Sequence, residues 1–294
     1  MTTNVVRARS LIRPRRLHPG LRQPLAVVGL VIVATWIVVT LLAPLLAGAD
    51  PLEQTFTPST GPSWDHLFGT DELGRDVFSR VLYGARVTLP LSLLVVVLAA
   101  TVGAIIGAIA GYFRGPLDGL CMRSTDLVFA FPPIILAMVV AAVLGRSLQN
   151  AAIAIVIVAW PPYARIVRGL VMGVGDTEYV QSARLLGASA RRALLRDVSP
   201  NVVGPVLVLM TLDLATAILL LSALSFLGLG AQPPQAEWGS MVAEGTQYFQ
   251  WWWMGTFPGL AIFTVVLAFN FIGDSLRDIL DPKTAWRSEG EVEA

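Results

Sequence analysis

The sequence predicts an all-α membrane protein whose chain crosses the bilayer six times. Hydrophobic residues make up 55% of its 294 residues, charged residues make up 14%, and the mean hydropathy is +0.68. A soluble domain carries roughly a quarter charged residues, so this chain is too apolar to be one. The apolar residues also form blocks close to the about 20 residues with which a helix crosses a bilayer. We expect these spans at residues 25–46, 88–112, 125–145, 151–172, 205–229 and 255–275.

The first span follows a basic tail, residues 1–24, which contains six arginines and no acidic residue. The apolar run 25–46 is about twice as long as the core of a signal peptide, which favours an extra transmembrane helix that is not cleaved. With the N-terminus inside, the cytoplasmic segments hold 17 of the 21 lysines and arginines. This asymmetry predicts that both termini lie in the cytoplasm.

The remaining segments complete the expected organisation. Residues 47–87 form an extracytoplasmic loop, residues 88–280 a core of five spans, and residues 281–294 an acidic cytoplasmic tail. Within the loop, residues 70–86 predict an amphipathic helix that Thr70 or Asp71 caps. Such a helix is expected to lie along the membrane surface with its apolar face down. That face carries Leu73, Val77, Phe78, Val81, Leu82 and Ala85.

Motifs of catalysis and cofactor binding are missing from the sequence. The chain has no G-x-x-x-x-G-K-[ST] loop for ATP, no H-E-x-x-H metal motif and no G-x-S-x-G serine motif. One cysteine, Cys121, rules out a disulfide within the chain. We therefore expect no catalytic, cofactor or metal-binding residues, and no nucleic-acid partner; the surrounding partner is the lipid bilayer.

Three glycines in the second span form a stripe on one helix face. Gly103, Gly107 and Gly111 are spaced four residues apart, and small residues at this spacing let two helix backbones approach closely. The stripe packs either against another helix of this chain or against a span of a partner.

Two spans contain proline pairs, and one contains a deep acidic residue. The pairs lie in "FPP" (131–133) and in "WPPY", where Trp160, Pro161 and Pro162 are close to the middle of a span. Each proline removes a backbone donor, so the pair either kinks the helix or lines a hydrated pathway. Asp213 in "MTLDLATAILLL" either lines that pathway or is a hydrogen-bonded packing residue.

The stretch 173–204 between spans four and five is amphipathic and cytoplasmic. Its sequence predicts a helix with Tyr179, Ala183 and Leu186 on one face, then Gly187 as an elbow. A second short helix follows and is expected to stop at Pro200. Such a unit either docks into a groove of another protein or lies on the lipid headgroups.

This stretch resembles the EAA loop of permease subunits of ABC importers. The loop's consensus is E-A-A, three residues, G, nine residues and I-x-L-P. Here Gln181-Ser182-Ala183 stand at the first positions, and Pro200 follows Gly187 by thirteen residues, as in the consensus. Asp197 and Ser199 replace its isoleucine and leucine. The resemblance implies that this region couples the spans to an ATPase through Tyr179, Gln181, Ser182, Ala183, Leu186, Gly187, Ala188 and Pro200.

Four longer motifs narrow the resemblance to one subfamily. They are "FGTDELGRDVFSRVLYGAR", "FAFPPIILAMVVAAVLG", "LSFLGLGAQPPQAEWGSMV" and "FPGLAIFTVVLAFNFIGDSLRDILDPK". Together they are similar to the C-type inner-membrane permeases of dipeptide, oligopeptide and nickel ABC importers. This resemblance implies the type I importer fold, a homologous B-type permease as partner, and two ATPase subunits that bind ATP and magnesium. It also implies an extracytoplasmic binding protein that delivers the ligand, and a location in the bacterial plasma (inner) membrane.

The resemblance leaves the ligand open. Peptides are the expected cargo, and nickel chelates, glutathione and opines are the alternatives. A stand-alone secondary transporter would need ion-coupling residues at the membrane midplane and inverted repeats. Asp213 is the one residue that supports this alternative, and it is weak support. A membrane enzyme is opposed by the missing catalytic motifs.

Overall fold

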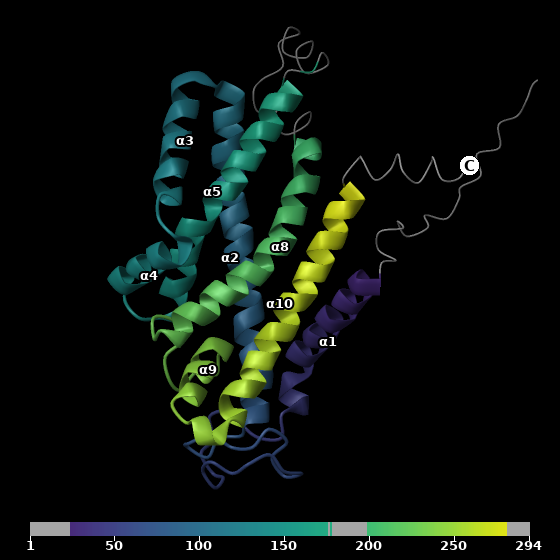
Figure 1. Cartoon of the computed structure of the whole chain (residues 1–294), viewed down its shortest axis with the longest axis vertical. Coiled ribbons are helices and arrows are strands. Elements are labelled where there is room, and N and C mark those ends of the chain that lie inside the picture. Colours follow the sequence, from purple (N-terminus) through teal and green to yellow (C-terminus); the bar gives the residue numbers. More distant parts are fainter. Residues whose placement is uncertain (1–23, 176, 178–198, 281–294) are drawn as a thin grey trace, which may run out of the picture.

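The computed structural model describes residues 24–175, 177 and 199–280, and these residues are arranged as a bundle of helices (Figure 1). The helices are α1 (Pro24–Leu46), α2 (Val77–Phe113), α3 (Gly115–Phe129), α4 (Pro133–Leu144), α5 (Leu148–Gly175), α8 (Ser199–Phe226), α9 (Trp238–Thr246), the 3-10 helix η3 (Phe249–Trp251) and α10 (Trp253–Leu280). The described residues form one isolated β-bridge, between Thr70 and Asp76, and no strand.

Five of these helices are long and apolar enough to cross a membrane: α1, α2, α5, α8 and α10. The pair α3 and α4 is a sixth candidate if it counts as one span, with a bend of 91° at its break. The longest helix, α2, has 37 residues and therefore spans about 55 Å, well beyond the about 30 Å of a bilayer's hydrocarbon core. The prediction of an all-α polytopic fold is confirmed.

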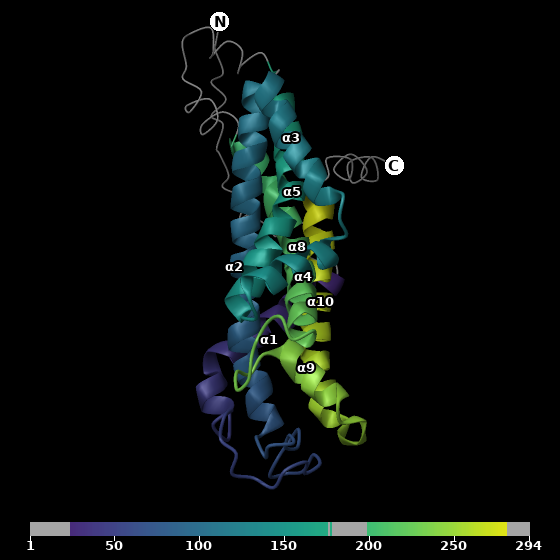
Figure 2. The same ribbon diagram turned by 90° about the vertical axis from the view of Figure 1, so that its left-hand side faces the viewer.

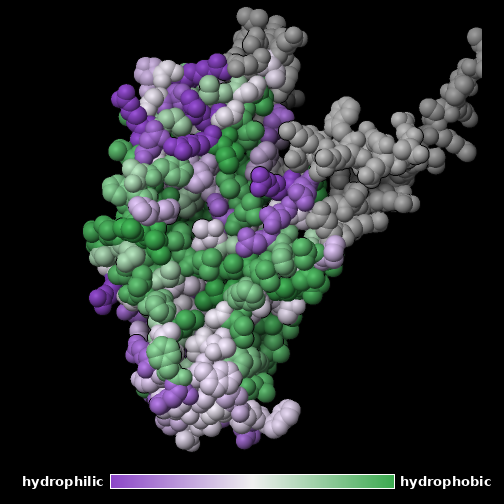
Figure 3. Space-filling view, viewed as in Figure 1, coloured by the Kyte–Doolittle hydropathy of each residue, from purple (hydrophilic) through white to green (hydrophobic). Residues whose placement is uncertain are grey.

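The bundle has two different ends. Residues 47–76, α9 and η3 close one of them, which we call the cap end. At the opposite end, α2 turns into α3, α5 finishes and α8 begins. Figure 3 shows a hydrophobic band across the middle of the molecule, with hydrophilic residues gathered at the end where α3 begins. This distribution matches a protein whose middle lies in lipid.

The structure corrects the prediction for residues 70–86. They do not form a separate surface helix, because α2 begins at Val77 and continues without a break to Phe113. Its N-cap is Asp76, whose carboxylate accepts a hydrogen bond from the Ser79 N–H at 2.8 Å, and neither Thr70 nor Asp71 caps it. Most of the predicted apolar face is buried in the cap end: Val77, Val81, Leu82 and Ala85 are each at most 5% exposed.

The predicted span 125–145 is present as two helices that meet at a sharp bend. α3 begins earlier than expected, after a turn in which Arg114 and Gly115 both have positive φ angles of 53° and 65°. It ends at Phe129, and α4 starts at Pro133. Proline has no N–H, which costs no hydrogen bond here because the N–H groups in the first turn of a helix have no partner within the helix. Figure 2 shows α4 lying across the other helices.

The glycine stripe of α2 packs against α5 of the same chain. A Cβ atom built on Gly103 or Gly107 would lie under 3.0 Å from the backbone of Trp160 or Ala164, closer than real Cβ atoms come. On Gly111 it would lie 2.8 Å from the Arg168 carbonyl oxygen. Because these three positions carry no side chain, α2 and α5 touch along their backbones.

Candidate functional site

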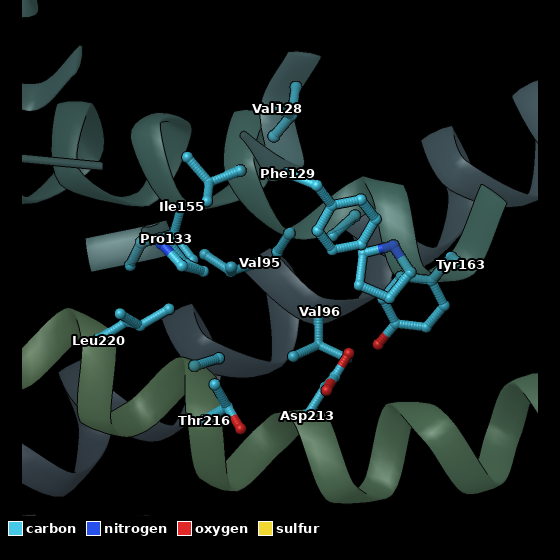
Figure 4. Close-up of a pocket in the computed structure, with 15 residues that line it drawn as sticks. Val95, Val96, Val128, Phe129, Pro133, Ile155, Tyr163, Asp213, Thr216 and Leu220 are labelled. Atoms are coloured by element: carbon cyan, nitrogen blue, oxygen red, sulfur yellow. The ribbon is translucent and has the colours of Figure 1, made fainter. Parts of the chain in front are cut away.

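A cavity of about 130 Å³ lies between helices α2, α3, α4, α5 and α8 (Figure 4). Its walls are apolar except for three side chains, Tyr163, Asp213 and Thr216. The apolar lining residues are Val95, Val96, Ala99, Val128, Phe129, Pro133, Ile155, Val158, Ala159, Pro162, Ala217 and Leu220. The bend between α3 and α4 brings Phe129 and Pro133 to this wall, so the broken span helps to build the site.

The three polar side chains come from two helices. Asp213 and Thr216 are one turn apart on α8, while Tyr163 belongs to α5 and is fully buried. The Tyr163 hydroxyl points toward the Asp213 carboxylate in Figure 4, and no hydrogen bond of ordinary geometry satisfies it within the described residues. No arginine, lysine or histidine of the described chain lines the cavity. Asp213 therefore carries an acidic group into apolar surroundings without a counter-ion.

The structure brings only part of the predicted pathway set together. Pro162 lines the cavity with Asp213, whereas Trp160 and Pro161 are not among its lining residues. The Trp160 carbonyl instead faces Gly103 on α2. Helix α5 continues through Pro161 and Pro162, so the break in this region lies at the other proline pair, between α3 and α4. Sequence reasoning missed Tyr163, although it is the last letter of the "WPPY" motif.

Two ion pairs attach α3 to α5 beside the cavity. Arg168 Nε and Nη2 donate to the two carboxylate oxygens of Asp118 at 2.5 and 2.6 Å, a bidentate arrangement. Arg165 Nη2 donates to Asp126 at 2.5 Å, and its guanidinium lies 4.2 Å from the centre of the Phe129 ring. Because Phe129 is part of the cavity wall, these contacts help to fix that wall.

A buried ionic cluster lies at the cap end. Arg75 donates to Asp71 at 2.6 Å, and both Arg75 and Arg80 reach Glu244 on α9, at 3.4 and 3.2 Å. Both arginines are 1% exposed. Asp71, Glu72 and Glu244 place carboxylate oxygens within 4.8 Å of one another. The two guanidiniums supply the positive charge that a metal ion would bring, so the cluster is explained as a structural link between residues 71–80 and α9.

Glu237 and Trp238 form a second link at the cap end. The Glu237 carboxylate accepts hydrogen bonds from the N–H groups of Gly239 and Ser240, both at 3.0 Å, and so caps α9. Burial raises the pKa of this carboxyl, and these hydrogen bonds oppose the rise. Trp238 is fully buried and donates from Nε1 to the Val81 carbonyl at 2.9 Å. Sequence reasoning missed both residues; they lie within the motif "LSFLGLGAQPPQAEWGSMV".

Most of the predicted coupling residues lie outside the described residues. These are Tyr179, Gln181, Ser182, Ala183, Leu186, Gly187 and Ala188. Pro200 is described, and it lies in the first turn of α8. The described helices place the two ends of the undescribed segment at the end of the bundle opposite the cap, because α5 finishes at Gly175 and α8 begins at Ser199 (Figure 1).

Comparison with known proteins places this arrangement in a family. Residues 103–286 match the family model described as binding-protein-dependent transport system inner membrane component. The chain belongs to this family. The match covers α3, α4, α5 and α8, and so includes most of the cavity wall and Asp213.

Full-length relatives extend the similarity to most of the permease. A dipeptide transport system permease protein, DppC, of Escherichia coli K12 is 46% identical, with 88% of this chain and 89% of the relative covered. The DppC protein of Alkalihalophilus pseudofirmus is 44% identical over 89% of this chain and 87% of its own. A glutathione transport system permease protein, GsiD, of Escherichia coli O1:K1 is 45% identical, with 89% of this chain and 88% of the relative covered.

A solved structure supports the fold of the permease. A chain from inward-facing conformations of the MetNI methionine ABC transporter superposes with a TM-score of 0.55 at 17% identity. The superposition covers 69% of this chain and 97% of the other. The permease therefore has the fold of an ABC importer membrane subunit.

Proposed function

We propose that the permease forms one half of the translocation pathway of an ATP-driven importer of peptides. The observation that carries this proposal is the cavity beside Asp213. An ionisable residue deep in a membrane helix is costly unless it faces a protein interior or water, and it marks a transport route more often than a packing site. The cavity has an open side, and Thr216 on its rim is exposed in the isolated chain. A homologous B-type permease is the proposed neighbour on that side.

The proposed orientation puts the cap end outside the cytoplasm. Basic residues favour the cytoplasmic side of a membrane, and the end opposite the cap carries Arg114, Arg123, Arg165 and Arg168. An extracytoplasmic binding protein would then deliver the peptide to the cap end, where the buried ionic cluster gives it a fixed surface. Two ATPase subunits would bind at the other end.

Residues 178–200 are the proposed contact with the ATPase. Their ends are carried by α5 and α8, which also carry Tyr163 and Asp213 of the cavity. A displacement of this segment by the ATPases would therefore act on the two helices that hold the polar groups of the pathway. Rigid helices transmit such a displacement without needing a further element.

Reconstitution tests the proposal. The permease is combined in proteoliposomes with the B-type permease, the two ATPase subunits and the binding protein, and uptake of a radiolabelled dipeptide is measured. We expect uptake that requires ATP and the binding protein, and that stops when this permease is left out. Uptake without ATP would favour a secondary transporter and overturn the proposal.

Glutathione is the second candidate cargo, because one relative at 45% identity is a glutathione transport system permease protein. The same vesicles distinguish the two ligands. Dipeptide uptake that excess unlabelled glutathione does not reduce supports the peptide assignment, and uptake of labelled glutathione in place of dipeptide supports the alternative.

A further inference from the structure

The cavity beside Asp213 combines an acidic group with a buried hydroxyl whose oxygen accepts no hydrogen bond within the described residues. Asp213 is the one charged side chain on its wall among the described residues. Apolar walls strengthen the attraction between this carboxylate and any cation that enters, because the surrounding dielectric is lower than that of water.

Tyr163 supplies an independent observation that points to a ligand. Its side chain is 0% exposed, and its hydroxyl, which faces the Asp213 carboxylate, makes no hydrogen bond of ordinary geometry within the described residues. Buried polar groups in native proteins are nearly always satisfied, so an unsatisfied one calls for a ligand or a bound water molecule. Figure 4 shows that the hydroxyl points toward Asp213, so both groups present oxygen atoms to one side of the cavity.

We propose that this cavity binds the terminal ammonium group of a peptide during its passage through the permease. An ammonium group has three N–H donors and no acceptor, and it matches the carboxylate of Asp213 with the hydroxyl oxygens of Tyr163 and Thr216. The cavity volume of about 130 Å³ leaves room for an ammonium group beside Asp213. This inference rests on the proposed peptide transport and adds the group that the permease recognises.

Charge-selective labelling tests the negative potential of the cavity without any peptide. Thr216→Cys is introduced into the assembled complex after Cys121 is replaced by serine, so that the new thiol of this chain is followed alone. Cationic and anionic methanethiosulfonate reagents are then compared in detergent solution. We expect Asp213→Asn to lower the ratio of cationic to anionic labelling rates by about tenfold, since a unit charge within a few ångströms acts oppositely on the two reagents.

Asp65→Asn is the matched control for this measurement. It also removes one aspartate carboxylate, but Asp65 is an exposed residue of the cap end and is not on the cavity wall. We expect it to leave the labelling ratio unchanged. An unchanged ratio in Asp213→Asn would overturn the inference, and it would indicate that a basic group of the partner subunit neutralises Asp213. Failure of both reagents to label Thr216→Cys would also overturn it, because the cavity would then be closed to cations from water.

Peptide protection tests the ammonium group itself. Alanyl-alanine is expected to slow the labelling of Thr216→Cys severalfold when Asp213 is present, whereas N-acetyl-alanyl-alanine, which has no ammonium group, should not. Equal effects of the two peptides, or none from either, would contradict the inference. Peptide transport as such is judged separately by ATP-dependent uptake in the wild-type complex, so failure of the ammonium site and failure of the transport assignment give different results.

Discussion

Asp71 and Asp126 each pair with an arginine over nearly the same distance, 2.6 and 2.5 Å, in very different surroundings. The side chains of Asp71 and Arg75 are 5% and 2% exposed, whereas those of Asp126 and Arg165 are 63% and 49% exposed. Removing one partner of a buried pair leaves an uncompensated charge in a medium that solvates it poorly. Removing one partner of an exposed pair leaves a charge that water solvates.

We therefore predict different losses of stability for two chemically identical substitutions. Asp71→Asn should destabilise the protein by about 3–5 kcal/mol, and Asp126→Asn by about 0–1 kcal/mol. The midpoint of thermal unfolding in detergent, measured for both variants of the assembled complex, provides the comparison. Equal midpoints would show that the buried cluster does not hold the cap end together.

Glu237 gives a prediction about pH. Burial raises the pKa of its carboxyl above the ordinary value of 4.5. From pH 4.5 up to the raised pKa, the unfolded chain has released a proton that the folded chain keeps, so this residue makes stability fall as pH rises. Glu237→Gln has no such proton, so its unfolding midpoint relative to wild type should increase as pH rises through this window. Parallel curves for the two proteins between pH 4.5 and 8 would refute the assignment.

At the scale of helices, the contact between α2 and α5 depends on missing side chains. Gly107 lies against the backbone of Ala164, while an added Cβ on Gly169, on α5, would meet no other atom within 4 Å. Gly107→Ala should force the two helices apart and destabilise the chain by about 1–3 kcal/mol. Gly169→Ala should be neutral or slightly stabilising, since alanine favours a helix over glycine. Yields of folded complex after detergent extraction distinguish the two; equal yields would argue against close backbone packing.

The long helices could be predicted from the sequence because each contains a long apolar run. Runs of about 20 apolar residues predicted α1, α2, α5, α8 and α10, and the spacing of Gly103, Gly107 and Gly111 predicted a close helix contact without identifying its partner. The bend between α3 and α4 was less predictable. Proline at Pro132 and Pro133 indicated a kink, but the angle of 91° depends on how α4 packs across its neighbours.

The cap end could not be predicted from local pattern because its energetics depend on contacts between distant segments. The apolar face of residues 70–86 is typical of a membrane-surface helix, yet it packs around Trp238, more than 150 residues later. Gly84 leaves room for that indole, since a Cβ there would lie 2.7 Å from its Cδ1 atom. The pairing of Arg80 with Glu244 likewise joins residues 164 positions apart. For the same reason Tyr163, whose hydroxyl faces Asp213 in the cavity, was not recognised.

At the scale of the whole molecule, orientation is tested by the chain's one cysteine. Cys121 lies on α3, toward the end opposite the cap, and not in a loop as its position between spans suggested. We predict that a membrane-impermeant thiol reagent labels it only from the cytoplasmic side. Gln54→Cys, at an exposed position of the cap end and in a chain with Cys121→Ser, should be labelled only from outside. Labelling of Cys121 in intact cells would invert the proposed topology.

The proposed function requires that residues 178–200 transmit movement between the ATPases and the cavity. We expect Gly187 to end a short helix in a left-handed conformation, which a β-branched residue adopts only with strain. Gly187→Val should distort the contact with the ATPase and leave insertion of the membrane helices intact. The sequence pattern predicts that Arg192 in the same segment faces water, so Arg192→Ala is the control and should cost little.

The most direct measurement is therefore ATP hydrolysis and dipeptide uptake in the same proteoliposomes, with the binding protein present. The wild-type complex and Arg192→Ala should show peptide-stimulated hydrolysis together with uptake. Gly187→Val should lose both the stimulation and the uptake, with normal amounts of the chain in the membrane. Normal stimulation and uptake in Gly187→Val would contradict the claim that this segment couples the permease to its ATPases.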